Sequence, residues 1–181
     1  MLKERSALQT ISGGSALSLS TSGGYAVKND RISFKLNSNG FVTEWVANGI
    51  QVLEQGNYPV YSNIRWIENE SPYGNHNFGD SYTYTTSATI TTSLAGDGSK
   101  CTLTVNVQHT KCPYIITYIV YANGVVDMNV EYTPKATLRR IGLDMVFPAG
   151  YENVEYYAKG PWENYIDRQT GSFLGRYTTT V

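Results

Sequence analysis

Two carboxylates and an arginine lie close together after residue 160 and raise the question of acid–base chemistry. Glu163 and Asp167 are separated by three residues, and Arg168 follows directly. Two carboxyl groups in different surroundings can act as a general acid and a general base. They also fit a structural role, in which a carboxylate accepts backbone N–H groups in a tight turn and pairs with Arg168. The residue types alone leave both roles open.

A second group of polar and aromatic residues breaks the regular pattern between Tyr58 and Asp80. Irregular segments of this kind on a β scaffold often carry function or contact a partner, although an ordinary solvated loop has the same composition. His76, within this segment, has no second histidine or cysteine at ligand spacing, and His109 continues a strand pattern. We therefore expect no metal site.

Alternation of apolar and polar residues dominates the rest of the chain and predicts strands. Four series are expected to face inward: Ile32, Phe34 and Leu36; Cys101, Leu103, Val105 and Val107; Val126, Met128, Val130 and Tyr132; and Ile141, Leu143, Met145 and Phe147. Further strands are expected over residues 41–47, 50–53, 82–94 and 114–121, with hairpin turns at Asn48-Gly49 and Asn123-Gly124. No window carries a helical period with caps. The sequence predicts an all-β fold, an antiparallel β-sandwich.

The two cysteines border one predicted hairpin. Its turn lies near Thr110–Pro113, so Cys101 should face a residue near Tyr121 and not Cys112. We therefore expect no disulfide between them.

Composition limits the class of protein. Of 181 residues, 41% are hydrophobic and 16% are charged, which is typical of a folded domain. A net charge of -1 argues against nucleic-acid and anionic-membrane partners. Residues 1–24, rich in Ser, Gly and Thr toward their end, are predicted to be a linker or lead-in segment, and residues 25–181 one β-sandwich domain. Because Tyr177–Val181 still reads as a strand, we expect a truncated sandwich with an open edge.

The sequence Lys159–Arg168, KGPWENYIDR, resembles a family signature, G-P-x-E-N-Y-x-D-R. This signature is found in the last domain, or small chain, of family 2 β-galactosidases. Arg140–Leu143 and Leu174–Tyr177 resemble strands that flank it in the family. Asn63–Trp66 stands where the family has N-F-x-R-A-P-x-D-N-D, and Ile67–Glu70 departs from that pattern.

The resemblance implies the N-terminal portion of a β-supersandwich of the galactose-mutarotase type. It places both catalytic glutamates in a TIM barrel of the whole enzyme, which hydrolyses terminal β-D-galactosides. This chain would then have no catalytic residue and would be inactive alone. The signature would be structural, with the rings of Trp162 and Tyr165 buried; its residues are Gly160, Pro161, Trp162, Glu163, Asn164, Tyr165, Asp167 and Arg168. Four residues would lie near the substrate at a rim of the active site: Asn69, Glu70, Tyr73 and His76.

The resemblance also implies partners and cofactors. The partners would be the remaining domains of the enzyme, the β-galactoside substrate and further copies of the chain in a homo-oligomer. No cofactor is expected in this chain, whereas Mg²⁺ and a monovalent cation would act in other domains. A stand-alone carbohydrate-binding module and an assembly module are the alternatives. The compartment stays open between the cytoplasm and the periplasm or exterior.

Overall fold

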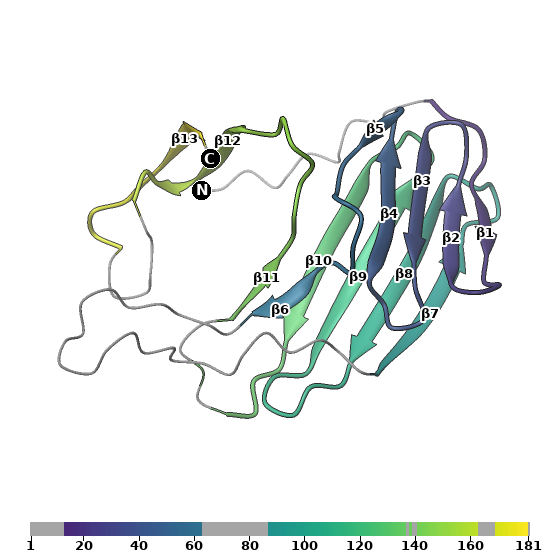
Figure 1. Ribbon diagram of the computed structural model, residues 1–181, viewed down its shortest axis with the longest axis horizontal. Helices are drawn as coiled ribbons and strands as arrows, with labels where there is room; N and C mark the ends of the chain where they lie inside the picture. Colours follow the sequence, from purple (N-terminus) through teal and green to yellow (C-terminus); the bar gives the residue numbers. More distant parts are fainter. Residues whose placement is uncertain (1–12, 63–86, 137, 139–140, 163–168, 181) are drawn as a thin grey trace. The chain divides into compact units, whose positions relative to one another are not determined.

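The computed structural model describes residues 13–62, 87–136, 138, 141–162 and 169–180. The chain divides into two units, residues 1–146 and residues 147–181. All regular elements in the described residues are strands, labelled β1 to β13 in Figure 1. Among these residues there is no helix of the length and apolar character needed to cross a membrane. The all-β prediction is confirmed.

Five strands of the first unit form one antiparallel sheet, here called the first sheet. They pair in chain order: β1 (Ser18–Ser20), β2 (Tyr25–Lys28), β3 (Ile32–Leu36), β4 (Val42–Ala47) and β5 (Ile50–Gln51). The sheet begins inside the segment predicted to be a linker, because Ser18–Ser20 pairs with β2. The predicted strand over residues 50–53 is shorter than expected and ends at Gln51.

Four strands form the second sheet, which is also antiparallel. They are β7 (Ala88–Leu94), β8 (Lys100–Val107), β9 (Tyr114–Tyr121) and β10 (Val126–Tyr132), again paired in chain order. β7 lies at one edge of this sheet and β10 at the other. The two-residue periodicity of strands places every second side chain on the face toward the first sheet.

The core lies between these two sheets, as their sequence alternation predicts. Ile32, Phe34 and Leu36 are buried on β3, and the side chains of Cys101–Val107 alternate between buried and half-buried positions on β8. The ring of Phe34 contacts that of Tyr118 on β9, with 5.2 Å between centroids. Apolar burial of this kind contributes about 25 cal/mol per Å². The sandwich is therefore held together by one continuous core.

Two glycines show how the sequence shapes this sandwich. Asn48 and Gly49 both adopt positive φ, of 51° and 79°, as a two-residue turn between β4 and β5 requires. At Gly40, with φ of 82°, an added Cβ would lie 2.3 Å from Cγ1 of Val105 on the second sheet. A side chain at residue 40 would therefore force Val105 or the backbone of this turn to shift.

The cysteine prediction is confirmed. Cys101 faces Val120, the neighbour of Tyr121, and both cysteines are free and buried. Burial raises the pKa of both thiols. Neither cysteine therefore has the exposed, low-pKa character of a reactive thiol.

A short two-stranded sheet completes the first unit. It pairs β6 (Val60–Ser62) with β11 (Gly142–Asp144). Leu143 and Met145 pack on the core as expected, whereas Ile141 is exposed. The inward series predicted there continued to Phe147, which is exposed in the second unit, so that part of the prediction is wrong. Alternation identifies a strand but does not fix how far its inward face is covered.

The described residues of the second unit form one hairpin. β12 (Asn153–Gly160) pairs over its whole length with β13 (Phe173–Thr180). The last strand therefore pairs along one edge with the strand before it: Tyr177 faces Tyr156 in this hairpin. The predicted open edge concerns its other side and stays a prediction. The partner lies some twenty residues earlier, and local alternation does not reveal such pairing.

Candidate functional site

Most of the predicted site residues fall outside the described part of the chain. This applies to the four residues predicted near the substrate: Asn69, Glu70, Tyr73 and His76. It applies equally to five residues of the signature: Glu163, Asn164, Tyr165, Asp167 and Arg168. Their predicted roles, including the pairing of Asp167 with Arg168, stay predictions.

The start of the signature lies at the end of β12. Gly160 is its last residue and is buried, and a cis peptide bond joins it to Pro161. Trp162 follows and is 75% exposed. The prediction that the ring of Trp162 is buried is therefore wrong. Nothing in a short aromatic motif distinguishes a ring that fills a core from one that lies on a surface.

Gly160 is required by packing at this position. An added Cβ would lie 2.9 Å from the ring of Tyr177 and 3.2 Å from the hydroxyl of Tyr156. These two tyrosines face each other across the hairpin, with ring centroids 5.5 Å apart. A larger residue at position 160 would therefore displace the tyrosine pair.

The same two tyrosines hold the backbone at the start of the signature. The Tyr156 hydroxyl donates to the carbonyl of Pro161 at 3.4 Å, and the Tyr177 hydroxyl donates to the carbonyl of Phe173 at 2.8 Å. Sequence reasoning did not identify this pair. The available signal was a tyrosine on either side of the signature, but their contact needs the hairpin register.

The two faces of this hairpin differ in charge. Residues with odd numbers on β12 and even numbers on β13 form one face, where Arg176 donates to Glu155 and Lys159 Nζ donates to Gln169 Oε1 at 3.0 Å. The opposite face carries no ionisable carboxyl or amino group and includes Phe173, which is 72% exposed. Trp162, two residues beyond β12, is a second exposed aromatic ring among the described residues of this unit. Exposed aromatic rings can stack on a sugar ring or pack on protein.

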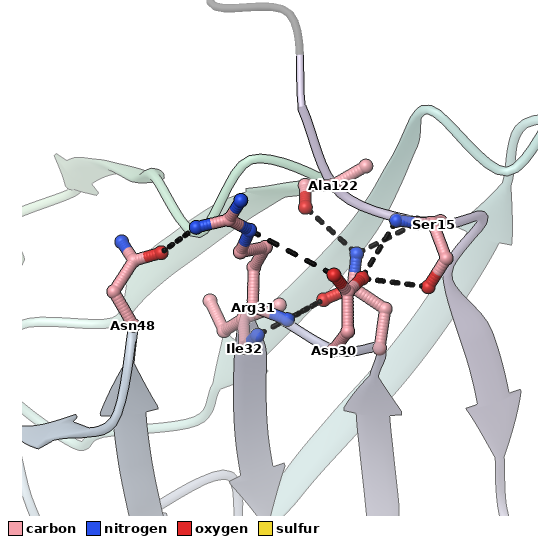
Figure 2. Close-up of polar contacts among 7 residues, drawn as sticks. Ser15, Asp30, Arg31, Ile32, Asn48 and Ala122 are labelled. Atoms are coloured by element: carbon pink, nitrogen blue, oxygen red, sulfur yellow. Dashed lines mark hydrogen bonds and ion pairs between the residues drawn. The ribbon is translucent and has the colours of Figure 1, made fainter.

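A polar cluster occupies one end of the sandwich, where loops from both sheets meet (Figure 2). The Asn29 amide donates to the carbonyls of Ser15 and Ala122, both at 2.7 Å. Its oxygen accepts from the backbone N–H groups of Arg31 at 2.8 Å and Ile32 at 2.9 Å. Ala122 follows β9, so Asn29 connects the two sheets.

Asp30 anchors the chain just before β1. Its carboxylate accepts from the backbone N–H and the hydroxyl of Ser15, both at 2.7 Å, and lies 3.7 Å from Arg31 Nε (Figure 2). These contacts, led by the Ser15 N–H, lower the pKa of Asp30. The described residues contain no group of three or more His, Cys, Asp or Glu placed to hold a metal ion. The contacts of Asn29 and Asp30, here called the clip, are therefore structural: they hold the chain before β1 and connect the two sheets.

His109 also has a structural contact pattern. It follows the end of β8 at Val107, and its Nδ1 accepts from the N–H groups of Lys111 at 3.2 Å and Cys112 at 3.0 Å. Its ring lies 4.7 Å from that of Tyr61 on β6. Nδ1 is thereby occupied as an acceptor, so His109 fixes the turn that begins β9.

Comparison with known proteins identifies the family. A family model described as β-galactosidase small chain matches residues 28–181. β-Galactosidases from Vibrio cholerae and Clostridium acetobutylicum are 36% and 38% identical over 67 and 68 residues. These matches cover 35% and 36% of this chain but only 6% and 8% of the relatives. A β-galactosidase from Staphylococcus xylosus is 36% identical over 69 residues, which cover 36% of this chain and 7% of that relative. Because the family model spans most of the sequence, the chain belongs to the β-galactosidase small-chain family.

Proposed function

We propose that this chain is a non-catalytic domain of a family 2 glycoside hydrolase that cleaves terminal β-D-galactosides. The observation that supports this most directly is the small-chain match over residues 28–181. In this proposal the chain supplies scaffold and one rim of the active site. The other domains of the enzyme supply the catalytic glutamates, together with Mg²⁺ and a monovalent cation. This chain itself holds no cofactor.

The described carboxyl groups support a non-catalytic role. Glycoside hydrolysis uses two carboxyl groups on either side of the scissile bond, one of them with a raised pKa. Hydrogen bonds lower the pKa of Asp30 and Asp97 instead. Asp30 and Asp97 are therefore stabilised in the ionised form and are poor proton donors.

The chain alone is therefore expected to be inactive. We would incubate it with a chromogenic β-galactoside and compare the rate with a buffer blank, using the whole enzyme as the positive control. No turnover is the expected result. Turnover that disappears in Glu163→Gln would contradict the proposal and place an active site in the signature.

The rim role is tested in the whole enzyme. There we expect His76→Ala and Tyr73→Phe to raise KM while the melting temperature stays within about 2 °C of the parent. Thr133→Ala, a change in the segment after β10, serves as a control for a generic surface effect. Unchanged KM in all variants would show that residues 69–76 do not border the sugar.

An independent sugar-binding module is the second candidate. The exposed rings of Trp162 and Phe173 favour it, since an exposed aromatic ring can stack on a pyranose. Calorimetric titration of the chain with a galactoside distinguishes the two. Saturable binding that Trp162→Ala abolishes supports the module, whereas no heat at millimolar sugar supports a scaffold role.

A further inference from the structure

β7 differs from the other edge strands of this chain. It pairs with β8 along all seven of its residues, and no described strand pairs with its outer edge. Its sequence, Ala88-Thr89-Ile90-Thr91-Thr92-Ser93-Leu94, contains no charged residue and no proline. Threonine and isoleucine favour extended structure. The outer edge is therefore a row of backbone donors and acceptors with nothing in its own side chains to repel another strand.

The other edge strands in the described residues have features that hinder pairing with another strand. β1 has three residues and β5 has two. β10 carries Asp127 and Glu131, while the hairpin strands β12 and β13 carry Glu155, Lys159 and Arg176. Short strands and charged side chains are the usual protection of sheet edges against pairing. Among the described edge strands longer than three residues, only β7 lacks both.

We propose that β7 pairs with β7 of a second copy of this chain, antiparallel about a two-fold axis near Thr91. The two four-stranded sheets then join into one continuous sheet of eight strands. The inference does not depend on the proposed function, because it rests only on the edge of the sandwich.

The sequence of β7 is compatible with itself in this arrangement. With Thr91 on the axis, Ile90 faces Thr92 of the other copy and Ala88 faces Leu94. These four residues lie at even positions, on the side of β7 that turns toward the core, and Ala88 and Ile90 pack on it. An antiparallel pairing that matches even with even positions keeps both core-facing sides on one side of the joined sheet. Leu94, 39% exposed, then meets the smallest side chain of the strand, that of Ala88.

The electrostatics also favour a second copy. Two like charges opposite each other destabilise a strand pair, and β7 brings none to the axis. Seven paired residues form roughly six to eight backbone hydrogen bonds along an edge about 24 Å long. An interface of one strand pair is smaller than the ~1,200 Å² of a standard stable complex. We therefore expect a dimer that dissociates on dilution.

Sedimentation equilibrium of the full 181-residue chain over a hundredfold concentration range measures the dimer directly. We expect a monomer–dimer equilibrium in the parent. Thr91→Lys should weaken dimerisation at least about tenfold, because two lysines then meet at the axis. Thr91→Glu should do the same. An equimolar mixture of the two variants should dimerise again, because lysine then faces glutamate.

Thr117→Lys is the matched control. Thr91, Thr104 and Thr117 are aligned across β7, β8 and β9, so the control places the same charge in the same row but two strands from the edge. It should dimerise like the parent. A parent that is monomeric throughout, a dimer insensitive to Thr91→Lys, or a mixture that stays monomeric would each overturn the proposal. Far-ultraviolet circular dichroism and a thermal melt establish that each variant is folded before it is compared.

Discussion

Replacing Asn29 by alanine should destabilise the sandwich more than most surface substitutions do. The side chain makes four hydrogen bonds of 2.7 to 2.9 Å, to Ser15, Arg31, Ile32 and Ala122. A typical internal hydrogen bond contributes about 0.5–1.5 kcal/mol net. The bonds to Ser15 and from the Arg31 N–H are exposed and contribute little, so we expect a loss of about 1–3 kcal/mol in the free energy of unfolding. Urea denaturation, followed by circular dichroism, measures it.

The Asn29→Asp variant tests the cause of that loss. Aspartate keeps the oxygen that accepts from the N–H groups of Arg31 and Ile32, but places a carboxylate oxygen against the carbonyls of Ser15 and Ala122. Repulsion there favours the protonated acid in the folded state, so the pKa of residue 29 should rise above its unfolded value of about 3.9. The variant should be less stable than the parent at neutral pH, and the difference should narrow as the pH falls through the raised value.

Two outcomes would refute this reasoning. A loss below about 1 kcal/mol in Asn29→Ala would show that water replaces the side chain without penalty and that Asn29 does not clip the sheets. A stability difference between Asn29→Asp and the parent that does not change with pH would show that the carboxylate avoids both carbonyls. Ser18→Ala, which removes one exposed hydrogen bond to the Lys28 carbonyl, is a suitable control with an expected change near 0.5 kcal/mol.

Three further predictions concern the same sandwich. His109→Ala should lower the free energy of unfolding by about 1–2 kcal/mol because two backbone N–H groups lose their acceptor; His109→Asn, whose side chain can accept the same bonds, should recover part of it in urea denaturation. Tyr118→Phe should raise stability by up to about 1 kcal/mol, since this buried hydroxyl has no hydrogen-bond partner among the described residues; a loss above 1 kcal/mol in the same assay would reveal a partner. Burial opposes the charged form of Glu44, but hydrogen bonds from Lys35 and Ser33 outweigh burial and lower the pKa of Glu44 below the ordinary 4.5. The stabilisation that Glu44 contributes is therefore present above pH 4.5 and is lost as the pH falls through the folded-state pKa. Acid titrations of stability should be shallower in Glu44→Gln, and equal slopes would contradict this.

The sequence predicted the sandwich well because its core imposes a local pattern. On β8, each inward position contacts apolar neighbours and each outward position is half-exposed, so alternation alone identifies the strand and its buried side. The Asn48-Gly49 turn was equally predictable from the sequence, because only certain residues adopt positive φ at low cost. These features need no knowledge of distant parts of the chain.

Contacts between distant residues were not predictable in this way. Asn29 and Ala122 are 93 positions apart, and no local pattern marks either as the partner of the other. The exposure of Trp162 and the pairing of β13 with β12 depend likewise on how segments meet in space. Of the candidate site, the sequence located the signature and its glycine, while the tyrosine pair that fixes it required the register of the hairpin.

The clip at Asn29 and Asp30 has a mechanical consequence. A load applied to the chain at Gly13 reaches the Ser15 contacts before it reaches the strand pairing of β1. Asn29 passes part of that load to Ala122 in the second sheet, and Leu17 passes another part through its N–H to the carbonyl of Gly98. Both sheets therefore bear the tension from the start. The sandwich should unfold under force as one unit, whereas without these contacts β1 would detach first.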